Sequence, residues 1–457
     1  MAGASALAMP TRAWSRQPSR PAIDPVRLRQ RLERLSTHGR PPGGTFADGV
    51  TRVAYSVADI TARALMLEEI KSAGVAPRMD PAGNIFARFG GDAGRPPILF
   101  GSHIDSVPGG GNFDGDLGTL AALEVLHAVQ AAKVTTRHPL EMVLWAHEES
   151  TAFGKGTAAS RIVAGDLKAG DMDQVWNGLR RGDAIRRIGG DPVRIEDAVR
   201  GKGAFHSYLE LHIEQGGTLD RAKVPIGIVE GIVAIHRYDV TIEGMANHAG
   251  TTPMGERQDA LVAASMLTLA VRDLARGAGR AEARPDNPTV GARLSAPGGS
   301  VGAPVGTVGR LDVTPNSPNV IPGRVVLSVE FRDLSEATLR EMGEALRARA
   351  AAIATDSQTK ILLELASTNP SALAHAGVQD AIGRAADREG LQTRRLPSGA
   401  GHDAQMIAAL CPMGMIFVPS VGGISHSPRE LTTWDDCARG ANVLLGAVLD
   451  LDGRDSI

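Results

Sequence analysis

The sequence predicts an α/β protein in which a larger α/β domain with a mixed central sheet is interrupted by a smaller ferredoxin-like α+β domain. Three observations carry this prediction. The first part of the chain alternates apolar strands with amphipathic helices, as βαβ units do. From about residue 217 the order becomes strand, helix, strand, strand, helix, strand, which is typical of a two-layer ferredoxin-like domain. After residue 368 the first rhythm resumes, so the two outer parts are expected to form one domain.

The elements of the larger domain follow from hydrophobic periodicity. Apolar residues at three- and four-residue spacing predict helices in 24–38, 57–74, 117–132 and 434–450. Apolar runs between turn residues predict strands in 84–91, 96–107, 140–150, 206–216 and 412–420. The second of these runs is nearly all apolar, so we expect it at the centre of the sheet, covered on both faces.

The smaller domain is predicted in the same way. Its strands are expected in 236–244, 307–313, 323–333 and 359–367, and its helices in 258–275 and 336–354. A connection rich in Gly, Pro and Ala, residues 276–306, lies inside it, and a loop of that length is either functional or disordered. The domain boundaries are therefore placed at 21–216 with 368–457 for the larger domain and at 217–367 for the smaller one.

Composition excludes several classes of protein. The 457 residues carry 49 Lys and Arg against 51 Asp and Glu, a formal charge of −2, so no nucleic-acid partner is expected. Two cysteines exclude a disulfide framework and a thiolate metal site, and a metal would have to be held by carboxylates and by some of the 12 His. No run of 18 apolar residues predicts a membrane span.

Residues 1–20 form an N-terminal extension that is small and apolar. It fits either an export signal that has lost its basic front or an ordinary extension. We expect a cytoplasmic protein, with export to the periplasm as the alternative.

The first candidate site cluster is GSHIDSVPGGGNFDGDLG. His103 ends an apolar strand, and Asp114 follows across a Gly-rich loop. Groups at the carboxyl ends of strands face the site crevice of an α/β sheet. Asp105, two residues after His103, is expected to hold the imidazole in one tautomer. A Gly-rich surface turn is the alternative interpretation of this segment.

The second cluster, WAHEES, also ends an apolar strand. Adjacent Glu148 and Glu149 point in different directions there, so one can bind a metal while the other faces a substrate. Two carboxylates at a buried strand end are costly unless a cation or a proton neutralises them. His147 is expected to be structural, because alternation turns it away from Glu148. A solvated acidic turn is the alternative.

Two further histidines complete the set. His212 lies on the strand LELHIEQG, with Gln215 just beyond it, although a lone strand histidine is more often a packed residue. His426 lies in the loop GGISHSPRE, where Glu430 is expected to orient its ring. Three His, one Asp and one Glu suit two divalent ions that share one bridging carboxylate, the arrangement that activates water for hydrolysis. Such ligands fit Zn²⁺ first, with Mn²⁺, Co²⁺ or Ni²⁺ as alternatives.

Nine motifs in order resemble one family. They are GSHIDSV, GGNFDGDLG, HEES, ELHIEQG, NHAGTTPM, PNVIPG, FRD, SGAGHDAQ and GGISHSPRE, spread from about residue 100 to 430. Together they look like the hydantoinase/carbamoylase branch of the aminoacylase-type dizinc amidohydrolases. That branch includes N-carbamoyl-L-amino acid hydrolase, β-ureidopropionase and allantoate amidohydrolase. The resemblance implies a catalytic α/β domain with a dizinc site and a lid domain that also forms a homodimer.

The resemblance also implies roles for the residues that match the motifs. One metal would be held by His103, Asp114 and His212, and the other by Asp114, Glu149 and His426. Glu148 would be the general base, which deprotonates the water and passes the proton to the leaving nitrogen.

For the substrate, the resemblance implies a second group of residues. Arg332 would clamp a carboxylate in a bidentate fork, and Asn319 would bind the same end. His248 would polarise the carbamoyl oxygen, reaching in from a partner subunit. Gln215 and the backbone at Gly401 would complete the pocket. Taken alone, Arg332 also fits a strand-end salt bridge.

The sequence therefore predicts a metal-dependent amidohydrolase that acts on a small carbamoyl or ureido substrate bearing a carboxylate. N-carbamoyl-L-amino acids and allantoate are equal candidates. An aminoacylase or dipeptidase of the same superfamily is the alternative enzyme. A binding protein without catalysis is the alternative from another class, although Glu148 and all five ligand positions are present.

Overall fold

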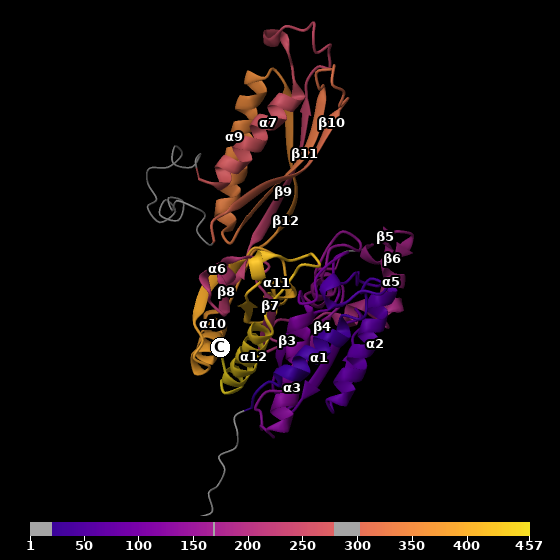
Figure 1. Ribbon diagram of the computed structural model, residues 1–457, viewed down its shortest axis with the longest axis vertical. Coiled ribbons are helices and arrows are strands. Elements are labelled where there is room, and N and C mark those ends of the chain that lie inside the picture. Colours follow the sequence, from indigo (N-terminus) through magenta and orange to yellow (C-terminus); the bar gives the residue numbers. More distant parts are fainter. Residues whose placement is uncertain (1–20, 168–169, 278–301) are drawn as a thin grey trace, which may run out of the picture.

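The computed structural model describes residues 21–167, 170–277 and 302–457. The N-terminal extension 1–20 and most of the connection 276–306 lie outside the described residues. Figure 1 shows two parts stacked along the long axis of the molecule, with the larger α/β domain below and the smaller domain above it. We call the smaller domain the lid.

The larger domain is built on a nine-stranded mixed sheet with the order β1-β2-β4-β3-β7-β15-β8-β13, and β14 pairs with β8 beside this path. These strands are β1 (Pro77–Met79), β2 (Ile85–Phe89), β3 (Ile98–His103), β4 (Leu140–Trp145), β7 (Ser207–Ile213), β8 (Ile226–Ile232), β13 (Ala372–Leu373), β14 (Thr393–Ser398) and β15 (Met413–Val418). The adjacent strands β4, β3, β7 and β15 run parallel to one another and are buried along their whole length. The prediction that the strand of 96–107 is central is confirmed.

Helices cover both faces of this sheet. The helices of the larger domain are α1 (Pro25–Leu35), α2 (Val57–Ser72), α3 (Asp116–Ala131), α4 (Ala158–Val163), α5 (Arg181–Arg187), α6 (Thr218–Ala222), α10 (Ala376–Arg388), α11 (Asp403–Ile407) and α12 (Trp434–Asp452). Leu120 of α3 and Leu444 of α12 share one apolar core with Phe100 of β3. Ile407 of α11 shares the core of the opposite face with Leu99. The alternation of Leu99 and Phe100 between two cores is what a strand buried on both sides requires.

The lid has the predicted βαββαβ order. Its strands β9 (Ala234–Glu243), β10 (Val305–Thr314), β11 (Arg324–Asp333) and β12 (Lys360–Asn369) form an antiparallel sheet in the order β10-β11-β9-β12. Helices α7 (Ala260–Ala275) and α9 (Glu336–Asp356) pack on one face, where they bury alternate residues of β9 and β11. A small hairpin, β5 (Val175–Trp176) and β6 (Leu179–Arg180), lies in the larger domain.

The crossover into the lid comes later than the expected boundary at 217. Strand β8 pairs with β15 and β14, so residues 226–232 belong to the larger sheet, and the lid sheet begins at Ala234. The sequence pattern missed β8 because its run is short and contains two glycines. Within the described residues, no helix combines the length and the apolar character needed to cross a membrane.

Candidate metal centre and cleft

The predicted metal-ligating residues come together at one edge of the large sheet. His103 is the last residue of β3, and His212 lies near the end of the neighbouring β7. Glu149 follows the end of β4, and His426 follows β15. Because β4, β3, β7 and β15 are parallel, their carboxyl ends meet at the same edge, and the four side chains arrive there from four separate segments.

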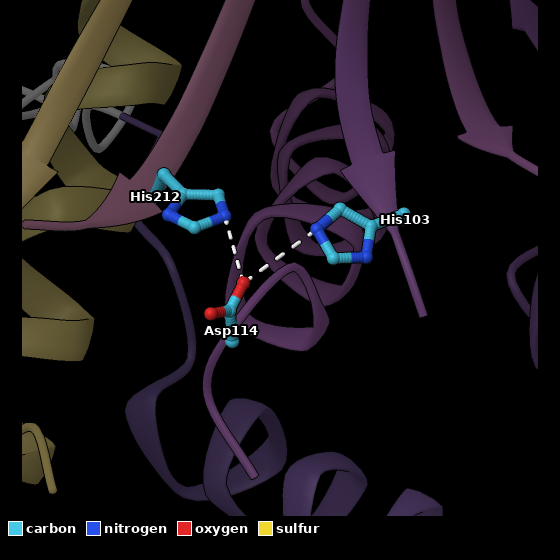
Figure 2. A group of neighbouring side chains, drawn as sticks. All are labelled: His103, Asp114 and His212. Atoms are coloured by element: carbon cyan, nitrogen blue, oxygen red, sulfur yellow. Dashed lines mark ion pairs between the residues drawn. The ribbon is translucent and has the colours of Figure 1, made fainter. Parts of the chain in front are cut away.

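Asp114 lies at the centre of this cluster. Its Oδ1 is 3.1 Å from His212 Nε2 and 3.6 Å from His103 Nε2 (Figure 2). Its other oxygen, Oδ2, is 3.3 Å from His426 Nε2, which in turn is 3.4 Å from Glu149 Oε1. The five side chains thus form two ligand groups that share Asp114, one with each carboxylate oxygen.

The hydrogen bonds of two imidazoles show what this arrangement needs. His103 Nδ1 lies 3.0 Å from the carbonyl oxygen of Asp105, and His212 Nδ1 lies 2.9 Å from that of Ile213. A carbonyl oxygen only accepts, so both Nδ1 atoms carry the proton and both Nε2 lone pairs face Asp114. His212 Nε2 is buried and has no hydrogen-bond partner. Lone pairs that face a carboxylate repel it unless a cation or a proton lies between them, so these residues fit a divalent ion.

The electrostatics of the cluster support the same conclusion. Burial, followed by the charge of Asp114, raises the pKa of Glu149 to about 8. Burial and the neighbouring Glu149 raise the pKa of Glu148 well above its usual range. Burial opposes the charge of His212, but the carboxylate of Asp114 outweighs it and raises the pKa of this ring to about 9. The cluster holds more negative charge than it can carry without protons or metal ions.

Asp105 supports the cluster differently from the prediction. Its backbone carbonyl, and not its carboxylate, accepts the His103 Nδ1 proton. The carboxylate accepts the backbone N–H groups of Glu148 and Glu149, at 3.1 and 3.0 Å. The prediction that its side chain orients the imidazole is wrong, because the side chain fixes the HEES turn instead.

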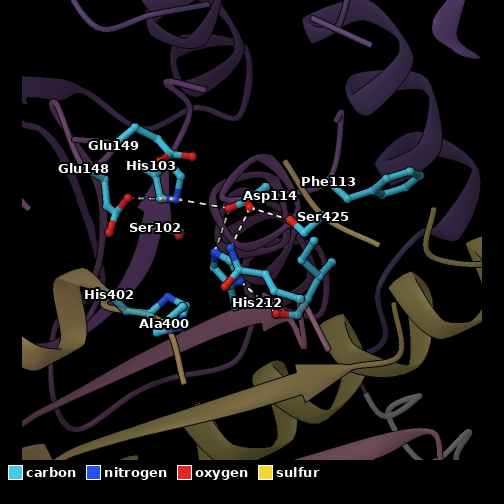
Figure 3. A network of polar contacts seen from close by, with 12 residues as sticks. Ser102, His103, Phe113, Asp114, Glu148, Glu149, His212, Ala400, His402 and Ser425 are labelled. Carbon is cyan, nitrogen blue, oxygen red and sulfur yellow. Dashed lines mark hydrogen bonds and ion pairs between the residues drawn. The ribbon is translucent and has the colours of Figure 1, made fainter. Parts of the chain in front are cut away.

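Glu430 also differs from its predicted role. Its Oε1 accepts the backbone N–H groups of Phe113 and Asp114 at 2.9 and 3.1 Å, and it makes no contact with the ring of His426. Ser425 Oγ lies 2.8 Å from Glu430 Oε2 and 3.0 Å from Asp114 Oδ2 (Figure 3). Glu430 therefore holds the loop that presents the central carboxylate.

Gly115 allows this loop to pass under a ligand ring. It adopts φ +69°, and a Cβ at this position would lie 2.4 Å from His103 Cε1 and 2.5 Å from Nδ1 and Nε2. No side chain fits in that space. The glycine that follows Asp114 is thus a requirement of the metal cluster as well as of the turn.

A cleft of about 480 Å³ opens from the cluster toward the lid. Of the residues predicted to bind substrate, Gln215, Arg332 and Gly401 line it. Gln215 adopts φ +57°, and its Nε2 donates to Asp114 Oδ2 at 2.7 Å. Arg332 reaches across from the lid and donates from Nη1 to the carbonyl oxygen of Gly399 at 2.7 Å.

His248 and Asn319 lie elsewhere. Both are exposed, and they are neighbours, because the N–H of Ala249 donates to the Asn319 carbonyl at 3.0 Å. They adjoin the end of the lid sheet where β9 finishes and β11 begins, whereas Arg332 is at the other end of β11. From Arg324 to Arg332 an extended strand covers about 26 Å. The prediction that Asn319 and Arg332 of one chain bind the same carboxylate is therefore wrong.

Sequence reasoning missed three residues that line the cleft. His402 is 2% exposed, packs against the ring of His212, and has its Nε2 2.8 Å from Ser398 Oγ (Figure 3). It stands in the SGAGHDAQ motif, which carried a signal, but only Gly401 was assigned from that motif. Arg161 and Asn369 come from α4 and from the end of β12, and their contact across the two domains has no signal in the sequence.

Comparison with known proteins gives consistent matches. Residues 99–450 match a family described as Peptidase family M20/M25/M40. The chain is 37% identical over 431 residues to an N-carbamoyl-L-amino acid amidohydrolase of Geobacillus stearothermophilus, covering 94% of this chain and 99% of that protein. It is 31% identical over 421 residues to allantoate amidohydrolase of Escherichia coli, covering 91% and 95%. Among solved structures, a hydantoinase/carbamoylase family amidase from Burkholderia multivorans matches with a TM-score of 0.83 and 34% identity, over 96% of this chain and all of that one.

Proposed function

This chain belongs to peptidase family M20/M25/M40, and from that premise we propose that it hydrolyses a carbamoyl or ureido C–N bond in a small substrate that bears a carboxylate. The candidate substrates are N-carbamoyl-L-amino acids and allantoate, and ammonia is released. The observation that carries the proposal is the set of imidazole lone pairs that face the shared carboxylate of Asp114. Relatives named for both candidate substrates support it.

The ligand assignment follows from the two groups around Asp114. His103, Asp114 and His212 would hold one divalent ion, and Asp114, Glu149 and His426 the other. When bound, the two ions would polarise the carbamoyl oxygen and activate a water. Imidazole and carboxylate ligands without thiolate favour Zn²⁺, with Mn²⁺, Co²⁺ or Ni²⁺ as alternatives.

Glu148 is the proposed general base. It lines the cleft beside both ligand groups but belongs to neither, and its Oε2 is 3.8 Å from His103 Nε2. Asp105 fixes the direction of its side chain through the backbone of the turn. Glu148 would accept a proton from the water that attacks the carbamoyl carbon and would deliver it to the nitrogen that leaves.

Arg332 is the proposed carboxylate clamp. Its Nε donates to Glu330 Oε1 at 2.7 Å and its Nη1 to the Gly399 carbonyl, so the guanidinium is held in one orientation. Within the described residues its Nη2 makes no hydrogen bond, and it is left to bind a substrate oxygen. Gln215 and the backbone at Gly401 would complete the pocket on the side of the metal cluster.

His248 requires a second copy of the chain, so we propose a homodimer formed through the lid. Its Nδ1 accepts the N–H groups of Gly250 and Thr251 at 3.0 and 3.2 Å. The proton of the neutral ring therefore lies on Nε2, which makes exposed His248 a hydrogen-bond donor suited to a developing oxyanion. Since His248 and Asn319 lie at the end of the lid sheet away from Arg332, only a partner lid can bring them to the cleft.

Mixing two inactive variants tests the shared site. Glu148→Gln and His248→Ala homodimers are each expected to be inactive, because each lacks one essential group at both sites. After subunit exchange, half of the dimers are mixed and each contains one complete site, so activity should return to roughly a quarter of wild type. No recovery in a mixture shown by mass spectrometry to have exchanged subunits would exclude a His248 contributed by the partner.

A substrate panel tests the reaction itself. Ammonia release would be measured from N-carbamoyl-L-amino acids, allantoate and β-ureidopropionate, beside amine release from N-acetyl amino acids and dipeptides, with a chelated sample as control. The proposal predicts turnover of a carbamoyl or ureido compound that stops on chelation. Faster turnover of N-acetyl amino acids or dipeptides than of every carbamoyl compound would identify an aminoacylase or dipeptidase instead.

A further inference from the structure

The charged groups that line the cleft are unevenly distributed. Among the described residues, the carboxylates that line it all belong to the metal cluster, namely Asp114, Glu148 and Glu149. The other charged side chains of the wall are all cationic, namely Lys155, Arg161, Arg237 and Arg332. A wall of one sign in a confined cleft focuses its field on the ligand, so the part of the cleft away from the metals favours anionic groups.

Two of these cations account for one carboxylate of the substrate. Arg237 and Arg332 both bind Glu330, which does not line the cleft. One carboxylate shared by two guanidinium groups leaves a single net positive charge on this part of the lid. That charge matches the carboxylate that the proposed function assigns to Arg332.

Arg161 is a second and separate cation on the opposite wall. It belongs to α4 of the larger domain and is 9% exposed. Its Nε donates to Thr157 Oγ1 at 3.0 Å, and its Nη1 donates to Asp166 at 2.8 Å. The side chain of Asp166 is 42% exposed and does not line the cleft, so water screens its charge while that of Arg161 remains directed inward.

The inner end of Arg161 is only weakly occupied. Its Nη2 lies 3.5 Å from Oδ1 of Asn369, on the lid, which is the outer limit of a hydrogen bond. A substrate carboxylate would form shorter, charge-assisted bonds with the same nitrogen. An apolar substituent would instead take water from a buried guanidinium and return no bond, which is unfavourable.

We propose that the substrate carries a second anionic group, and that it is the N-carbamoyl derivative of a dicarboxylic amino acid. Arg332 binds the carboxylate next to the carbamoyl nitrogen, and Arg161 binds the distal carboxylate with Asn369 beside it. This inference rests on the proposed function for the reaction, and it adds the class of side chain that the cleft selects.

The test compares an isosteric pair of substrates. The metal-loaded enzyme would be assayed with N-carbamoyl-L-glutamate and N-carbamoyl-L-glutamine, and with N-carbamoyl-L-leucine and allantoate for comparison. We expect kcat/KM for the glutamate compound to exceed that for the glutamine compound by roughly 10- to 100-fold, the value of a hydrogen-bonded charge. Added salt should reduce this preference, because it screens the second charge. A faster reaction with the leucine compound or with allantoate would overturn the proposal.

Variants separate binding from structure. Arg161→Gln should lower kcat/KM for the glutamate compound by roughly 10- to 100-fold and leave the glutamine compound within about 3-fold. Arg161→Lys keeps the charge without the planar fork and should retain part of the preference, which keeps the test open if the glutamine variant does not fold. Arg194→Gln removes the same charge at an exposed surface ion pair and serves as the matched control.

The outcomes also distinguish this inference from the function on which it rests. An equal loss on both substrates in Arg161→Gln would show a structural role and overturn the inference. If no carbamoyl compound reacts but N-acetyl-L-glutamate is cleaved with the same dependence on Arg161, the proposed reaction is wrong and the second anion site stands.

Discussion

Replacing Gly115 by alanine tests how closely the metal cluster depends on its loop. The new Cβ would lie 2.4 Å from the His103 ring, whereas ordinary contacts of this kind begin near 3.4 Å. The ring must therefore move by about 1 Å, well beyond the roughly 0.2 Å that metal–ligand distances tolerate. We expect Gly115→Ala to lose the ion held with His103 and to lose activity by about 100-fold or more, as misplacements of this size do.

A matched control removes the effect of backbone strain. Gly390 has the same φ of +69°, but a Cβ there would meet nothing within 4 Å. Alanine costs about 1–2 kcal/mol in this left-handed conformation at either position. Both variants should therefore unfold at lower urea concentration, and only Gly115→Ala should lose metal by elemental analysis. Full metal content and activity within about 3-fold of wild type in Gly115→Ala would refute the argument.

Three further predictions follow from the buried groups. Arg52 is 1% exposed, forms a buried ion pair with Asp116 and donates to three backbone carbonyls, so Arg52→Met should cost about 3–5 kcal/mol in urea unfolding, and a loss under 1 kcal/mol would contradict this. Burial raises the pKa of Cys411 to about 12 and that of buried Cys437 still further, so neither thiol should react with a disulfide reagent at pH 8 until the chain unfolds. Because the folded chain keeps these protons while the unfolded chain loses them above about pH 8.5, both thiols should stabilise the fold below that pH and progressively less toward pH 12, as unfolding at increasing pH would show. Chelation should abolish turnover and Zn²⁺ should restore it, and activity that survives verified removal of metal would contradict the two-ion site.

The metal cluster could be anticipated because its residues follow buried strands. His103, Glu149, His212 and His426 each stand at or just beyond the end of a strand, and parallel strands bring such ends together. Strand periodicity is strongly expressed in the sequence, so the position of each group followed from it. Asp114 could be added because only a loop that turns back toward His103 puts a carboxylate between them.

The supporting residues could not be assigned in the same way. Asp105 and Glu430 bind backbone N–H groups, at Glu148 and at Asp114 among others, and every residue but proline offers such a group. Proximity in the sequence suggested side-chain contacts with the nearest histidines, which the loops do not make. Which N–H a carboxylate reaches depends on the loop path, and the sequence pattern does not specify that path.

Contacts between the two domains were the hardest to foresee. Thirteen residues separate Asn319 and Arg332, which suggested one pocket, but an extended strand carries them to opposite ends of the lid. Arg161 and Asn369 are far apart in the sequence and meet only because the lid folds back over α4. The sheet register that brings such residues together is fixed by tertiary packing, which periodicity alone does not describe.

The central claim is that Glu148 acts as the general base beside two metal ions. It is tested most directly by ammonia release from the best carbamoyl substrate in Glu148→Gln, with metal content and substrate binding measured on the same sample. An exposed exchange on α9, Glu344→Gln, is the control. The account predicts two metals per chain, retained binding and a loss of about 10²- to 10⁴-fold in turnover. Unchanged turnover in a fully metal-loaded Glu148→Gln enzyme would contradict it.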